Sequence, residues 1–168
     1  ELMQALLERG ANVNAVITKA PPLGRLGPTG TAGTIIGGGG LTGATPFFMA
    51  ALAGDVDTMK LLVANGANPA LPAKDGTTPI MAAAGTTGFY DLESNVPESS
   101  HLAAVRLAVE LGGDVNAVNA LGNTPLHIAT HGGFDSVVKH LAAKGAAINV
   151  KNKAGETPLR IADGVIVI

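Results

Sequence analysis

The 168-residue chain has no cysteine and no tryptophan, and four phenylalanines and one tyrosine are its only aromatic residues besides histidine. Without cysteine it can form no disulfide, thiolate zinc site, iron–sulfur cluster or cysteine nucleophile. An excess of positive charge is also lacking, because 11 Lys and Arg stand against 13 Asp and Glu. Since proteins hold a phosphate backbone through a basic field, nucleic acid is not an expected partner.

Long apolar runs are absent as well. No stretch approaches the roughly 18 uninterrupted apolar residues of a membrane span, so membrane insertion is not expected. The first residues do not form the positively charged region with which a signal peptide begins. A targeting signal before residue 1 stays open. Apolar residues nevertheless make up 46% of the chain, with 23 glycines and a mean hydropathy of +0.33. This length and composition indicate one ordinary folded domain.

A dipeptide, Thr-Pro, recurs four times along the chain. The first and last of the three intervals are equal, and the middle one is the same period with an insertion. A glycine marks this period too, because it lies at one constant distance before each of the last three Thr-Pro pairs and further before the first. A fixed period of this length predicts a repeat architecture. The markers are Thr45-Pro46, Thr78-Pro79, Thr124-Pro125 and Thr157-Pro158, with Gly10, Gly66, Gly112 and Gly145.

These markers have a physical meaning in each unit. Threonine is a good helix N-cap and proline suits the first helical position, so each Thr-Pro is expected to begin a helix. A second apolar stretch with helical spacing ends on the glycine, which is the residue that most readily ends a helix in the left-handed conformation. The Asn- and Gly-rich segment between Gly145 and Thr157 favours a tight turn. Each unit is therefore predicted to be two short antiparallel helices and a hairpin-like finger.

The unit resembles the ankyrin repeat, whose period is about 33 residues and whose signature is T-P-L-H-x-A. Residues 124–129 match that signature completely, and residues 45–50, 78–83 and 157–162 match it loosely. The resemblance implies an all-α ankyrin-repeat solenoid, with fingers along one edge of a concave groove and first helices as its floor. The family's histidine, which links neighbouring helices by hydrogen bonds, is replaced in three units. We therefore expect few such bonds and mainly apolar packing between repeats; the replacements are Phe48, Met81 and Arg160.

The chain is divided as a single domain, 1–168, of unequal units. A half repeat (1–16) and a finger insertion (17–40) precede repeats at 41–73, 74–118 and 119–150, and a partial repeat covers 151–168. The first unit supplies only a second helix and the last only a first helix. Either neighbouring repeats of a longer chain cover these ends, or copies of the chain assemble head to tail into a filament.

Two insertions interrupt the period. The glycine-rich segment 17–40 lacks the Gly-Lys-Ser/Thr of a phosphate-binding loop, and it is either a floppy loop or an extended hairpin. The second insertion, 86–99, contains Phe89 and Tyr90 and three acidic residues. Adjacent aromatics in an aromatic-poor chain indicate either a lid that packs on the solenoid or an anchor for a partner.

Catalytic and metal sites are not expected. His127 and His131 share a helix face, yet His127 stands at the structural position of the repeat signature, and no zinc motif surrounds it. Asp55, Asp57 and Asp135 lie at expected starts of second helices and are interpreted as capping and dipole residues. Since no nucleophile is paired with a base and no cofactor loop is present, no cofactor is predicted and the chain is not expected to be an enzyme.

Function follows from the resemblance, which implies a protein–protein interaction module. Two alternatives remain: a structural protein that self-associates end to end, and a small-molecule binder or enzyme-associated domain with a pocket between the insertions. The compartment stays open, because the composition fits exported bacterial arrays and cytoplasmic ones. The expected contact residues are Phe89 and Tyr90 of the insertion; Pro72, Lys74, Asp75, Thr77, Val118, Ala120, Leu121, Asn123, Lys151, Lys153, Ala154 and Glu156 of the fingers; and Leu52, Ala53, His131 and Gly132 at first-helix ends.

Overall fold

The structure is a computed structural model that describes residues 2–19, 41–85 and 96–163. Within these ranges the chain forms eight helices and no strand, so the all-α expectation is confirmed. The first helices of the units follow the Thr-Pro pairs, and the second helices end next to the marker glycines. The helices are α1 (Leu2–Glu8), α2 (Pro46–Leu52), α3 (Val56–Ala64), α4 (Pro79–Ala83), α5 (Glu98–Glu110), α6 (Pro125–His131), α7 (Asp135–Ala143) and α8 (Pro158–Ala162).

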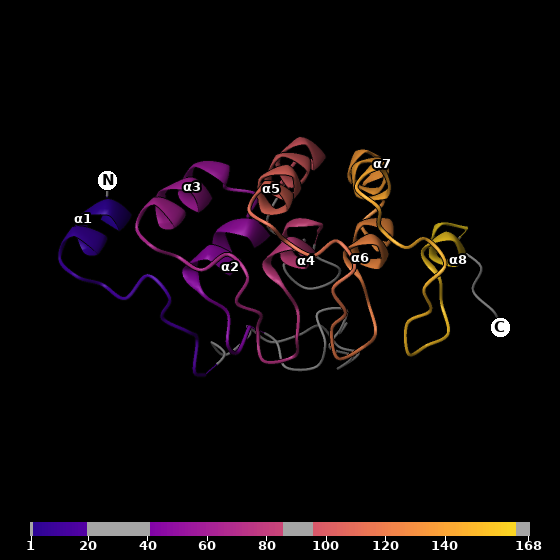
Figure 1. The fold of residues 1–168 in the computed structure, drawn as a ribbon, viewed down its shortest axis with the longest axis horizontal. Coiled ribbons are helices and arrows are strands. Elements are labelled where there is room, and N and C mark those ends of the chain that lie inside the picture. The colour runs from indigo at the N-terminus through magenta and orange to yellow at the C-terminus, as the bar shows by residue number, and fades with distance from the viewer. Residues whose placement is uncertain (1, 20–40, 86–95, 164–168) are drawn as a thin grey trace, which may run out of the picture.

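The helices form two rows that run the length of an elongated molecule. Figure 1 shows the second helices α1, α3, α5 and α7 in one row and the first helices α2, α4, α6 and α8 in the other. Hairpin loops project from the row of first helices, and α1 and α8 lie at opposite ends of the two rows. This is the arrangement of a solenoid, in which each unit contacts only its neighbours.

Most first helices begin as the sequence predicts. The hydroxyl oxygens of Thr45, Thr124 and Thr157 each accept a hydrogen bond from the backbone N–H three residues later. Thr78 has the same extended backbone but its hydroxyl makes no capping bond, and this buried oxygen has no partner in the described part of the chain. The prediction of a threonine cap is therefore wrong at Thr78.

The predicted helix stops are confirmed by the backbone. The φ angle is +85° at Gly10, +87° at Gly66 and +88° at both Gly112 and Gly145. These angles lie in the left-handed region that glycine adopts without steric cost. The marker glycines thus turn the chain from each second helix toward the next finger.

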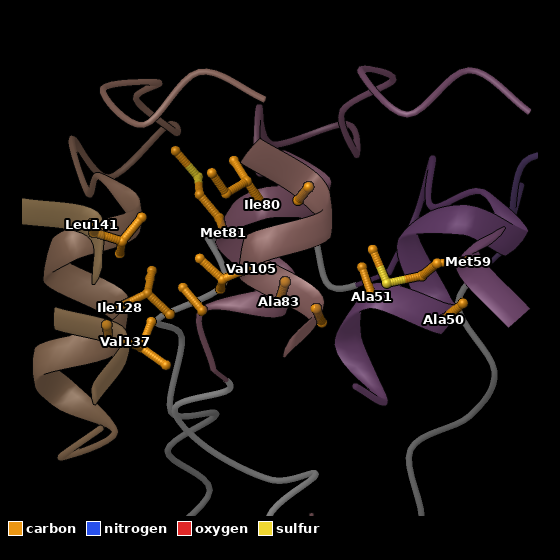
Figure 2. Packing of buried hydrophobic residues seen from close by; sticks show 14 of the residues in the cluster. Ala50, Ala51, Met59, Ile80, Met81, Ala83, Val105, Ile128, Val137 and Leu141 are labelled. Carbon is orange, nitrogen blue, oxygen red and sulfur yellow. The ribbon is translucent and has the colours of Figure 1, made fainter. Parts of the chain in front are cut away.

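One apolar cluster runs through the repeats from α2 to α7. Figure 2 shows that Met59 of α3 packs near Ala50 and Ala51 of α2, while Val137 and Leu141 of α7 lie near Ile128 of α6. Many members of the cluster are alanines, and small side chains allow neighbouring helices to approach closely. The scarcity of aromatics in the sequence therefore reflects a core built on closely packed helices.

The second insertion ends earlier than the sequence analysis expected. Glu98 and Ser99 belong to α5, which has 13 residues, whereas α3 and α7 have 9 each.

Helix α7 has no capping side chain of its own, since its N-cap is Phe134 and not the expected Asp135. Glu98 supplies an acceptor instead: its Oε1 accepts hydrogen bonds from Ser136 N at 2.7 Å and from Ser136 Oγ at 2.6 Å. These bonds hold the pKa of Glu98 below its ordinary value.

The core position of Leu126 generates a stability prediction. Its side chain is 2% exposed. Leu126→Ala is expected to lower the free energy of unfolding by about 2–5 kcal/mol, because it removes buried methyl groups and leaves a cavity. Val118→Ala is the matched control. Val118 is 55% exposed, and its truncation is expected to cost less than about 0.5 kcal/mol. Urea titration of both variants measures the difference, and equal losses would contradict this account of the core.

The two kinds of threonine cap can be compared directly. Thr45→Val removes a hydroxyl that bonds Phe48 N at 3.1 Å, so we expect a loss of about 1 kcal/mol in unfolding free energy. Thr78→Val removes a buried hydroxyl that has no partner among the described residues. That change is expected to be neutral or stabilising, because an unsatisfied polar group is removed. Thermal or urea unfolding of the two variants is the measurement. A larger loss of unfolding free energy in Thr78→Val than in Thr45→Val would contradict the conclusion that only Thr45 caps its helix.

Candidate protein-interaction surface

Each finger is a tight hairpin closed by its own backbone. Across the turn, Ala73 N donates to Thr77 O at 2.8 Å, and Asn152 N donates to Glu156 O at 2.9 Å. The equivalent bond in the finger between them, from Asn119 N to Asn123 O, is 3.1 Å long. The predicted hairpin shape of the fingers is therefore confirmed.

Successive fingers are also joined to one another. Lys74 N donates to Thr42 O at 2.9 Å, Ala120 N donates to Asp75 O at 2.8 Å, and Lys153 N donates to Leu121 O at 2.9 Å. The glycine after each acceptor has a positive φ angle. At Gly122, an added Cβ would also lie 2.9 Å from Lys153 N, which is too close. Glycine is thus required both by the turn and by the approach of the next finger.

Polar side chains within the turns add rigidity to the fingers. Asn119 Oδ1 accepts hydrogen bonds from Leu121 N and Asn123 N, each at 3.0 Å. Asn152 does the same in the last finger, with bonds of 3.0 Å from Ala154 N and Glu156 N. The sequence analysis assigned the Asn- and Gly-rich segment that contains Asn152 to a tight turn. It missed the same role for Asn119, although an asparagine shortly before a turn glycine is a recognisable turn signal.

The fingers present a row of exposed side chains, which we call the finger surface. Val118 is 55% exposed, a large fraction for an apolar side chain. Half-buried Asp75, Leu121 and Glu156 lie between the exposed positions. Exposed His131 lies at the end of α6, and exposed Ala53 and half-buried Gly132 follow α2 and α6 directly. The finger surface consists of Pro72, Lys74, Val118, Ala120, Lys151, Lys153 and Ala154.

Three of the expected contact residues are buried, and the expectation is wrong for them. Thr77 is 1% exposed and donates its hydroxyl to Asp75. Asn123 is 3% exposed and accepts a hydrogen bond from Asn152 Nδ2 at 3.0 Å. Leu52 belongs to an apolar cluster between α2 and the fingers. All three hold the array together and offer no surface to a partner.

The two insertions contribute no described contact to this surface. Phe89 and Tyr90 lie outside the described residues, and so does most of the glycine-rich segment 17–40. The pocket expected between the insertions falls outside them for the same reason. The aromatic pair therefore stays a prediction.

His127 has the role that the repeat signature predicts. Its backbone N–H donates to Thr124 Oγ1, its Nδ1 accepts from Thr124 N at 3.2 Å, and its Nε2 contacts Glu156 O of the next unit at 3.1 Å. These contacts require the neutral tautomer with its proton on Nε2. Burial lowers the pKa of His127, and the charge of His131 adds to the shift. Burial also lowers the pKa of His131 and of His140.

No group of three or more His, Asp or Glu residues in the described ranges is arranged to hold a metal ion. The apolar residues Phe48 and Met81 occupy the equivalents of the His127 position in two other units, and both are fully buried. Apolar packing thus replaces the histidine bond there, as the sequence analysis expects.

A hollow lies at the C-terminal end of the described array, where Ile148 and Asn149 lead into the last finger. It has a volume of about 390 Å³ and is bounded by α6, α7 and α8. Its lining is mainly apolar, and one wall is Phe134, whose ring stacks on His101 with 4.7 Å between centroids. Sequence reasoning did not foresee this hollow, because it depends on where the helices end in space.

Comparison with known families agrees with this geometry. The model of a single ankyrin repeat matches residues 42–74, and a model of ankyrin repeats in three copies matches residues 96–163. Together the two matches cover more than half of the chain. The chain belongs to the ankyrin repeat family. Ankyrin repeats are generally protein–protein interaction modules and are typically not enzymes. No curated protein matches the chain.

The sequence analysis did not expect this ankyrin array to insert into a membrane, and the lengths of its helices bear on that expectation. Among the described residues no helix is long and apolar enough to cross a membrane. The longest of them, α5, has 13 residues.

The buried histidine predicts a pH dependence. The pKa of His127 is lowered in the folded chain from the ordinary 6.5, so the unfolded chain binds the proton more readily. The free energy of unfolding is therefore expected to be highest above about pH 7 and to fall as the pH drops below about 6.5. Protonation would also place a hydrogen on Nδ1, which must accept from Thr124 N.

His127→Gln should make the stability less dependent on pH than in the original chain. Urea midpoints at about pH 7.5 and pH 5.5 measure this difference. Some dependence should remain, because burial lowers the pKa of His131 and His140 as well. Lys139→Gln, an exposed change on α7, is the control and should retain the full dependence. If the stability of His127→Gln depended on pH as strongly as that of the original chain, the role given to the lowered pKa of His127 would be wrong.

Proposed function

We propose that this ankyrin array is a protein-binding module and that the finger surface is where its partner docks. The observation that carries the proposal is the row of backbone bonds that joins the fingers into one edge. A surface whose backbone is already fixed loses little conformational freedom on binding, which favours affinity. The exposed side chains along this edge come from three successive fingers and can vary without disturbing the fold.

The charges of the fingers indicate the chemistry of the partner. Asp75 accepts hydrogen bonds from Thr77, and Glu156 accepts one from Asn152. These acidic groups are engaged inside their own turns. In the described part of the chain, Lys74, Lys151 and Lys153 make no ion pair or side-chain hydrogen bond and are exposed. The free charges of the finger surface are therefore positive, which favours a partner segment with carboxylates among apolar residues that pack against Val118 and Ala120.

Site-specific photocrosslinking tests where the partner docks. A benzophenone amino acid placed at Ala120 on the finger surface is expected to form a covalent adduct with the partner in the cells that express the protein. The matched position is Ala103, an equally small and exposed residue on α5. It should give no adduct with the same protein. An adduct from Ala103 and none from Ala120 would move the binding site to the second helices.

Charge reversal then tests the contribution of the lysines. Lys74→Glu combined with Lys153→Glu is expected to weaken binding of the crosslinked partner about tenfold or more, as loss of central contacts does. The control is Lys60→Glu combined with Lys139→Glu, which makes the same change of charge on exposed residues of the second helices. Titration calorimetry measures both, and equal losses would show that only the overall charge matters.

A further inference from the structure

Asparagine side chains tie some of the units to the turn that follows the next second helix. Asn14 Nδ2 donates to Gly66 O at 3.2 Å, and Asn14 Oδ1 accepts from Asn68 N at 2.8 Å. Asn116 makes the same pair of bonds, at 3.2 and 2.8 Å, to a carbonyl and an N–H of the turn at 145–147. We call this pair of bonds the asparagine clasp.

The clasp is missing between the repeat at 41–73 and the repeat at 74–118, because Ala70 stands at the clasping position. We call this boundary the unclasped junction. The backbone of the turn is the same as in the clasped units, since Ala70 N donates to Asn68 Oδ1 at 3.0 Å. The N–H of Asn14 makes the same bond to the side chain two residues before it, also at 3.0 Å. The turn is therefore formed, and only the side chain that would reach the next unit is absent.

The backbone groups that a clasp would bond are present on the other side of the unclasped junction. They are Gly112 O and Asp114 N, which correspond to Gly66 O and Asn68 N in the unit before. Both residues are exposed, and neither of these two groups makes a hydrogen bond to a described residue. The turn after α5 is thus ready for a clasp that the preceding unit does not supply.

A second tie between units is also present on only one side of α5. Toward α7, Glu98 accepts two hydrogen bonds from Ser136, and the ring of His101 stacks on Phe134. Ala103 of α5 occupies the position that Ser136 has in α7, and it has no hydroxyl to donate to the unit before it. Helix α5 is therefore bonded to α7 by a side chain whose counterpart toward α3 is absent.

A hollow of about 260 Å³ lies between α3 and α5. Val56 and Lys60 of α3 line one side, and Leu102, Arg106 and Glu110 of α5 line the other. Two of these three charged residues are positive, and no ion pair links them among the described residues. Charge attraction therefore does not close the hollow.

The unclasped junction is held at the first helices, at the fingers and at the start of α3. Helix α2 packs against α4, and Figure 1 shows the two side by side in the row of first helices. Between the fingers, Lys74 N donates to Thr42 O at 2.9 Å. At Gly54, just before α3, an added Cβ would lie 2.9 Å from Ser100 Cβ, so the chain is closely packed there. The missing clasp lies at the opposite end of α3.

We propose that the unclasped junction is a hinge of the array, at which the unit of α2 and α3 swings relative to the block from α4 to α7. The packing of α2 on α4 and the close contact at Gly54 form the pivot. The turn after α3 then moves toward or away from the turn after α5, and the curvature of the finger edge changes while its backbone bonds stay intact. The inference rests on the ties between units and does not depend on what the array binds.

Installing the missing clasp is the first test. Ala70→Asn is expected to raise the thermal midpoint by about 2–4 °C, because two hydrogen bonds form in a chain of this size. Asn116→Ala, which removes an existing clasp, should lower the midpoint by a similar amount. Both positions are exposed, so neither change should disturb the core, which circular dichroism checks.

Distances between spin labels test the motion itself. The chain has no cysteine, so two introduced cysteines take nitroxide labels at chosen positions alone. Exposed Ala64 of α3 and Ala143 of α7 lie on either side of the hinge. In double electron–electron resonance, the distribution of distances between these labels should narrow when Ala70→Asn is added. The control pair, exposed Arg106 and Arg160, lies on one side of the hinge, and its distribution should stay unchanged.

The hinge is overturned if Ala70→Asn raises the thermal midpoint but leaves the distribution between Ala64 and Ala143 as broad as before, since the junction was then already rigid. It is also overturned if Ala70→Asn does not raise the midpoint, because the absent side chain is then not what loosens the junction. Equal narrowing of both label pairs would show a general stiffening of the array and would likewise contradict the proposal.

Discussion

The structure depends on one repeated packing event, in which a second helix buries two apolar positions against the first helix of its own unit and a neighbouring second helix. Met59 and Leu62 do this in α3, Val105 and Ala108 in α5, and Val137 and Leu141 in α7. In Figure 2, Met59 lies near Ala51 of α2, Val105 lies near Ala83 of α4, and Leu141 lies near Ile128 of α6. Because every unit is held by the units beside it, stability comes from interfaces between neighbours more than from any one repeat.

That dependence also shapes the functional surface. From residue 42 to residue 153, one backbone hydrogen bond joins each pair of successive fingers, and the side-chain bond from Asn152 to Asn123 strengthens the last junction. The side chains of Pro72, Val118 and Lys153 are exposed and contribute little to this framework. A repeat array can in this way keep one constant skeleton while its exposed finger residues fit a particular partner.

Much of the architecture could be predicted from the sequence, because the repeat period, the Thr-Pro helix starts and the glycine stops act locally. The interaction residues were harder to predict. The resemblance to the ankyrin repeat implied that Thr77 and Asn123 are contact positions, yet their side chains are buried and bond to groups of the fingers themselves. Three features depend on three-dimensional stacking, which spacing along the chain does not encode. They are the bond from Ser136 to Glu98, the Thr78 hydroxyl that has no partner among the described residues, and the hollow beside α8.

Amide hydrogen exchange, measured helix by helix, tests this dependence on neighbours most directly. Protection reports the free energy of local opening, so it should follow the number of packed neighbours and not helix length alone. The account predicts the strongest protection in α4, α5 and α6, which have neighbours on both sides, and the weakest in α1 and α8. Equal protection in all eight described helices, or stronger protection at the ends, would contradict it.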